Sequence, residues 1–414
     1  MLAALGLGAG TGGAVEYAPV LNATVLGGQY FYQGTNANVA GNVSAVAGAM
    51  VKTGDQWSLM PTYAANYQGT KGVSDSVAAG SLFQQEMDHR ASLTGIYSPE
   101  ESSWKLKPSL SYKREFLKQT RDEAWGRGLF DYEKIGAGFE VENVYREPFS
   151  YRFGLDYFRI RFPNYQSLES QAPLDPQGNP LTRAGANRNT LDTHNLQFSA
   201  SGSMPYPSHE PKVALQGGYS LLAQRYIDQT LIDSRGQIQG GAAGLGLHRT
   251  DYLQTLSGAA AFPRALRLMD TDCRLDSKLS LSFSHNGSNQ NYYDANTKQF
   301  FFDAYSYTSY RFGPSFSLSW GEAKRPTAVS LSFNYTRVQY MARQAQGATG
   351  VYTGSRLRQD QYQVGLGGVY PISPGFSLRA QTNFLWARSN NSFEQGYAYN
   401  YRTANYLMGF TYEY

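Results

Sequence analysis

The chain has 414 residues and a formal net charge of +4, and only 16% of its residues are charged. So weak a charge, with no dense run of Lys or Arg, argues against nucleic acid as a partner. No run of about 18 apolar residues occurs, which excludes a transmembrane helix. The single cysteine, Cys273, excludes an internal disulfide.

The first segment, residues 1–14, reads MLAALGLGAGTGGA and is predicted to be a flexible tail. The first Lys or Arg of the chain is Lys52, whereas a signal peptide begins with a positively charged region before its apolar core. We therefore expect that a signal, or an upstream domain, has been removed ahead of residue 1.

From residue 15 onward, apolar and polar residues alternate with a period of two, which predicts β-strands. In the clearest strand, 57–68, Trp57 and Tyr63 share one face while Ser58 and Asn66 share the other. Short turns rich in Pro, Gly, Ser or Asp alternate with longer polar connections. The 16 predicted strands are 15–33, 41–52, 57–68, 86–97, 104–117, 129–143, 149–160, 191–204, 211–226, 248–262, 274–285, 303–320, 326–341, 357–370, 376–388 and 399–414.

Aromatic residues flank the short turns and share the apolar register. Trp57 and Tyr67, like Phe376 and Trp386, are ten residues apart. At roughly 3.3 Å per residue and a tilt of roughly 40°, that separation spans about 25 Å, the height of a membrane's apolar band. The mean hydropathy of −0.46 is that of a soluble protein, but a polar lumen cancels an apolar exterior in any average. The flanking residues are Trp57, Tyr97, Trp104, Phe149, Phe262, Trp320, Tyr370 and Phe376.

The last strand alternates Tyr406, Met408, Phe410, Tyr412 and Tyr414 with small or polar residues. This strand resembles the assembly signal of Gram-negative outer-membrane β-barrel proteins, and the porin-like resemblance extends over nearly the whole chain. It implies an all-β, transmembrane, antiparallel up-and-down barrel of about 16 strands over residues 15–414, with short periplasmic turns and long extracellular loops. It also implies the bacterial outer membrane as location, and lipid bilayer, lipopolysaccharide and the barrel-assembly machinery as partners.

The polar register is expected to line the lumen, because a barrel of about 16 strands is wide enough to leave an aqueous channel. Asp88 is expected about opposite Lys113, as a cross-strand ion pair. Charges of both signs share this register, so strong ion selectivity is not expected. The lumen-lining candidates are Lys105, Lys107, Lys113, Asp88, Gln361 and Arg379.

The longest irregular stretch is the connection 161–190. A long loop without structure of its own is usually functional or disordered. Folded into the mouth, this loop would narrow the pore, with Asp175, Arg183 and Arg188 as constriction candidates. The alternative is a surface loop that serves other contacts.

The sequence offers little evidence of chemistry. Its five histidines lie in different predicted elements, and no pair has metal-ligand spacing. The Gly-rich segment 234–247 lacks the spacing of a nucleotide-binding loop. We therefore predict that the chain is not an enzyme and has no catalytic residues, metal or cofactor.

The leading hypothesis is a porin-like channel for passive diffusion of small polar solutes through a water-filled lumen. The alternative is the barrel component of an envelope machine, such as an exopolysaccharide export channel or a structural anchor for periplasmic or surface partners. The 263–273 turn is unusually long for its side and carries Cys273, so it is the predicted contact for a periplasmic partner.

Overall fold

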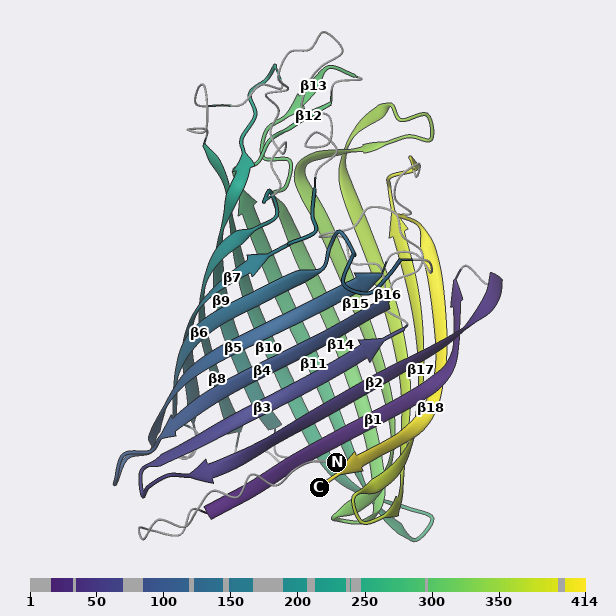
Figure 1. Ribbon diagram of the computed structural model, residues 1–414. Helices are drawn as coiled ribbons and strands as arrows, with labels where there is room; N and C mark the ends of the chain where they lie inside the picture. Colours follow the sequence, from purple (N-terminus) through teal and green to yellow (C-terminus); the bar gives the residue numbers. More distant parts are fainter. Residues whose placement is uncertain are drawn as a thin grey trace.

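The computed structural model describes residues 16–32, 35–69, 85–118, 123–143, 149–166, 189–206, 213–235, 239, 247–294, 297–393 and 399–414. These residues form a closed barrel of 16 antiparallel strands and one small hairpin (Figure 1). In this part of the chain no helix is long and apolar enough to cross a membrane.

The barrel strands are β1 (Glu16–Tyr32), β2 (Thr35–Lys52), β3 (Trp57–Gln68), β4 (Gln85–Tyr97), β5 (Trp104–Lys118), β6 (Tyr132–Asn143), β7 (Ser150–Arg161), β8 (Thr193–Tyr206), β9 (Val213–Thr230), β10 (His248–Leu268), β11 (Thr271–Ser288), β14 (Tyr307–Glu322), β15 (Arg325–Gln346), β16 (Tyr352–Ser373), β17 (Phe376–Ser389) and β18 (Tyr401–Glu413). The hairpin of β12 (Tyr292–Asp294) and β13 (Gln299–Phe301) belongs to the connection between β11 and β14.

Each barrel strand pairs with its neighbours in sequence, and β1 closes the barrel against β18. Figure 1 shows the start of β1 and the C-terminus at the lower end, and the β12–β13 hairpin at the upper end. Short turns are periplasmic in barrels of this kind. The predicted count of 16 strands and their up-and-down order are confirmed.

The outward face of the strands is apolar. Leu110, Ile135 and Leu256 have exposed fractions of 61%, 62% and 61%, which no soluble core would leave uncovered. Trp57 and Trp104, next to the short turns, are exposed on the same face. This surface suits a lipid bilayer with aromatic side chains at its boundary.

Three predicted connections are wrong because strands continue through them. The first, between residues 33 and 41, is mostly strand, since β2 begins at Thr35. The connection predicted at 342–356 is mostly strand, since β15 runs to Gln346 and β16 begins at Tyr352. Polar residues in both strands removed the apolar alternation on which the prediction relied, but backbone pairing does not require it. Gln344 still pairs with Arg356 after a register shift.

The long periplasmic turn predicted at 263–273 is also wrong. The pairing of β10 with β11 continues to Leu268 and Thr271, and only Met269 and Asp270 form the turn. Both have positive φ, 45° and 64°, as two-residue hairpin turns require. Pro263 suggested a turn, but the pairing of β10 with β9 ends at Ala261, and Pro is tolerated on an unpaired strand edge. The hairpin projects beyond the neighbouring turns at the lower end of the barrel (Figure 1).

The seam between β1 and β18 is unusually close. A Cβ atom on Gly28 would collide with the backbone of Tyr406 and Leu407, and one on Gly409 would collide with the backbone of Val25 and Leu26. Glycine is therefore required at both positions so that the two strands can approach. The predicted assembly-signal residues lie along this seam or just past it: Phe410, Tyr412 and Tyr414. Their role in assembly stays a prediction.

Candidate functional site: the lumen face

One wall of the lumen, formed by β5, β6 and β7, carries a ladder of opposite charges. Lys107 forms ion pairs with Glu142 and, at 3.5 Å, with Glu140. Arg152 on β7 contacts Glu140 at 3.4 Å and Glu142 at 3.2 Å. Lys105 lies in register with Glu142. Two carboxylates thus compensate neighbouring cations, and Glu142 is almost fully buried among them.

A second cluster lies farther from the periplasmic turns on the same wall. The Lys113 ammonium contacts Glu115 at 2.6 Å and donates to the Tyr132 hydroxyl at 3.0 Å. Tyr132 in turn donates to Glu115 at 2.7 Å. The predicted Asp88–Lys113 pair is wrong, because Asp88 lies opposite Glu115 and accepts from Asn66 at 3.2 Å. The prediction missed the register by two residues, which keeps the face but changes the partner.

The remaining candidates lie on a different wall. Gln361 on β16 is in register with Thr336, and Arg379 on β17 contacts Glu413 at 3.8 Å. The structure therefore brings Lys105 and Lys107 together but keeps Gln361 and Arg379 apart from them. The role of all six candidates in passing solutes stays a prediction.

Much of the lumen face between the charged ladder and Arg379 consists of hydroxyls. Hydrogen-bonded pairs across neighbouring strands include Ser150 with Ser203 at 2.5 Å and Thr255 with Ser284 at 2.9 Å. A cavity of about 550 Å³ extends along β7 to β14. Its cations include Lys278 and Arg311, for which no ion pair is found in the described part of the chain.

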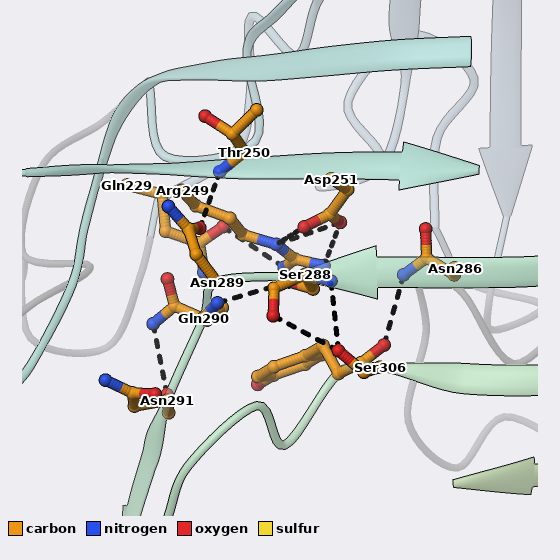
Figure 2. Close-up of polar contacts among 11 residues, drawn as sticks. Gln229, Arg249, Thr250, Asp251, Asn286, Ser288, Asn289, Gln290, Asn291 and Ser306 are labelled. Carbon is orange, nitrogen blue, oxygen red and sulfur yellow. Dashed lines mark hydrogen bonds and ion pairs between the residues drawn. The ribbon is translucent and has the colours of Figure 1, made fainter. Parts of the chain in front are cut away.

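A network of hydrogen bonds among polar side chains lies at the outer end of β10 and β11 (Figure 2). The Arg249 guanidinium donates to both carboxylate oxygens of Asp251, at 3.0 and 2.6 Å, and to Gln229 at 3.3 Å. The rings of Tyr226 and Tyr305 lie on it at 4.4 and 4.5 Å. Arg249 is fully paired, so this network stabilises the mouth rather than offering a free charge.

Two buried carboxylates hold the outer connections in place. Asp131 accepts from the backbone N–H groups of Leu117 at 2.8 Å and Gly128 at 3.2 Å. Asp192 accepts from the N–H of Phe162 at 2.8 Å. Burial raises the pKa of the Asp131 carboxyl above its usual value, although the two N–H donors act in the opposite direction.

Replacing Asp131 by alanine should loosen the 123–131 connection. Two hydrogen bonds to a charged acceptor are lost, each contributing about 1.5–3 kcal/mol. Trypsin should then cleave the folded variant after Arg127, which is exposed, much faster than the parent protein. Glu100→Ala in an exposed periplasmic turn serves as the control. Equal cleavage rates for all three proteins would contradict this role of Asp131.

Several predictions fall outside the described residues. Asp175, Arg183 and Arg188 all lie in 167–188, so the constriction hypothesis stays untested. Among the residues that the structure describes, no group of three potential metal ligands gathers. His89 and His194 accept from or donate to neighbouring tyrosines, Tyr63 and Tyr157.

Sequence reasoning missed the residues that pair the cations. Glu142 and Glu115 share the polar register of Glu140 and Lys113, so the period of two contained that signal. Asp251, two residues after Arg249, gave a signal of the same kind, but the rings from β9 and from the β11–β14 connection gave none.

No family model matches this sequence, and no curated protein matches it. Solved structures that resemble it include a loop-deletion mutant of OmpT, an outer-membrane protein of Vibrio cholerae, at 9% identity, with 96% of this chain and 99% of that chain covered and a TM-score of 0.43. OccAB1 of Acinetobacter baumannii shows 8% identity, 96% coverage of both chains and a TM-score of 0.44. A bacterial polysaccharide outer-membrane secretin shows 9% identity, coverage of 96% and 98%, and a TM-score of 0.43.

The prediction that the chain is not an enzyme is withdrawn. The matches include further OmpT structures at 9% identity and TM-scores of 0.43 and 0.44. They name no reaction for this chain. The exclusion that the sequence suggested is not kept, and no reaction is put in its place.

The fold, the apolar outer face and the polar lumen face together decide the class of this protein. Sixteen strands close on themselves without an edge, which is the form in which a sheet can cross a bilayer. Exposed aromatic residues bound the outward apolar surface. The chain is a closed antiparallel β-barrel of 16 strands, and its apolar outer face suits a lipid bilayer.

Proposed function

We propose that the barrel is a channel that lets small polar solutes diffuse through its lumen. The observation that carries this proposal is the cavity of about 550 Å³, which is bounded mainly by serine, glycine and basic side chains. Such a wall offers hydrogen bonds to water and to solutes and binds none of them tightly.

Conductance across a planar bilayer tests the proposal. Purified, refolded protein should give steady ohmic steps that are absent with protein denatured beforehand. Silence from the parent protein, with conductance after deletion of 167–188, would favour a gated channel instead. Silence from both proteins would contradict a channel of either kind.

A second candidate is export of a polysaccharide. The specific observation in its favour is the number of tyrosines near the outer mouth, among them Tyr292, Tyr305, Tyr352 and Tyr399. Aromatic faces attract the C–H groups of sugars, because the π-face is negative. Partial block of the conductance by long oligosaccharides but not by equally large polyethylene glycols would favour this candidate.

A third candidate, the structural anchor, depends on the β10–β11 hairpin. Its tip exposes Leu268 at 48% and Met269 at 100%. A periplasmic partner at 263–273 stays a proposal. Cys273, which is buried, lies where β11 begins to pair with β14.

A further inference from the structure

A small cavity at the outer mouth contains a half-buried arginine surrounded by aromatic rings. It has a volume of about 120 Å³ and lies between the β11–β14 connection, β15, β16 and the β17–β18 connection. Its principal side chains are Tyr292, Phe301, Tyr305, Arg343, Tyr352 and Tyr399.

Arg343 differs from Arg249 in the partner of its charge. Both arginines lie near the outer mouth beside tyrosine rings, and Tyr305 is close to both sites. Arg249 is neutralised by Asp251 at 2.6 Å. Arg343 donates to the Tyr399 hydroxyl at 3.3 Å and lies 5.4 Å from the Tyr340 ring. Within the described ranges, no carboxylate forms an ion pair with Arg343. A half-buried charge without an ion-pair partner favours a ligand of opposite charge.

The nearby carboxylate is already engaged. Asp294 accepts from the Tyr352 hydroxyl at 2.8 Å. The Tyr352 ring packs on Phe301 at 4.8 Å, and Phe301 stacks on Tyr292 at 6.2 Å. Phe301 is 7% exposed and Leu357 only 1%. The aromatic wall is therefore held in place before any ligand arrives, which lowers the entropic cost of binding.

We propose that this cavity binds the carboxylate-bearing end of an acidic sugar, such as a hexuronate. The guanidinium presents paired N–H groups that match the two oxygens of a carboxylate. The tyrosine rings offer negative faces to the C–H face of a pyranose. Gln344, which also borders the cavity, carries an amide of the kind that hydrogen-bonds to hydroxyls. Neutral sugars meet the rings but leave the guanidinium uncompensated.

This inference deepens the proposed function, because it names a class of solute for the channel. It rests on the proposed function only where it implies that acidic sugars pass through the mouth. Binding itself needs no conduction. Detergent-solubilised barrel that is silent in bilayers can still bind uronate, so failure of one proposal is distinguishable from failure of the other.

Isothermal titration at low salt tests the site with four probes: glucuronate, glucose, acetate and inorganic phosphate. Glucuronate should bind at least tenfold more tightly than glucose and than acetate, because only glucuronate uses both the guanidinium and the rings. Phosphate that binds as tightly as glucuronate would identify a general anion site and overturn the sugar assignment. Equal affinity for glucuronate and glucose would overturn the role of Arg343.

Three variants separate binding from folding. Arg343→Gln should weaken glucuronate binding at least tenfold and leave glucose binding unchanged. Arg343→Lys keeps the charge without the paired donors and should give an intermediate affinity. Arg388→Gln removes an exposed arginine at the outer end of β17 and should change nothing. Unchanged glucuronate affinity in Arg343→Gln, or an equal loss in Arg388→Gln, would contradict the proposal. If Arg343→Gln does not refold, the comparison of Arg343→Lys with the parent protein decides.

Discussion

Replacing Gly28 by valine is expected to prevent most of the protein from closing into a barrel. A side chain at this position would meet the backbone of Tyr406 and Leu407 on β18. Backbone atoms cannot turn aside as a flexible side chain can, so β1 and β18 must separate and lose ladder hydrogen bonds. The cost should exceed the about 1–3 kcal/mol that is typical of overpacking in a core.

The neighbouring glycine supplies a matched control for this variant. Gly27 lies on the same strand, but a Cβ atom there would have nothing within 4 Å. Gly27→Val should therefore refold at least as well as the parent protein, since valine favours strands more than glycine does. The measurement is the fraction of compact barrel in unheated gel electrophoresis after refolding, together with the urea midpoint. Equal refolding of the two variants would contradict the close seam.

Replacing both Glu140 and Glu142 by glutamine is expected to make the channel markedly more selective for anions. The ladder would then keep Lys107 and Arg152 without these carboxylate partners. A unit charge at 4 Å in water contributes about 1 kcal/mol, so the ratio of anion to cation permeability should rise about fivefold or more. Reversal potentials in a potassium chloride gradient measure this ratio.

Salt and position provide the controls for this second variant. The shift should be large near 0.1 M salt, where the Debye length is about 10 Å, and small at 1 M, where it is about 3 Å. Glu133→Gln removes a carboxylate from the same strand β6, but that carboxylate contacts Arg114 at 3.8 Å in the outward register. It should leave selectivity unchanged. The same shift in both variants would mean that the ladder does not face the ion path.

The alternation of residue types was sufficient to predict the strands and their faces. Because side chains on a strand alternate between the two sides, Trp57 and Leu110 could be placed outward and Lys107 inward without knowing any neighbour. The prediction failed where this local signal was weak. Polar residues in β15 and β16, and Pro263 in β10, concealed strands that backbone pairing continues.

Contacts between strands were less predictable, because register depends on where each hairpin turns. An error of two residues in the register leaves each side chain on its correct face but gives it a different partner across the strands. Asp88 illustrates this, because it lies opposite Glu115 and not opposite Lys113. The mouth was less predictable still. Arg249 meets Asp251 two residues along the same strand, whereas the phenol group beside Arg343 comes from a connection that only the fold brings to it.

The sequence by itself determined that this chain is a 16-stranded barrel with an apolar outside and a polar lumen, because a period of two is a local property. The tertiary structure alone decided which groups meet across strands. Nothing in the sequence distinguishes Gly27 from Gly28. Only at Gly28, however, would a Cβ atom collide with the backbone of β18. Closure of the barrel brings the first strand and the last strand together, and no local pattern records the distance between them.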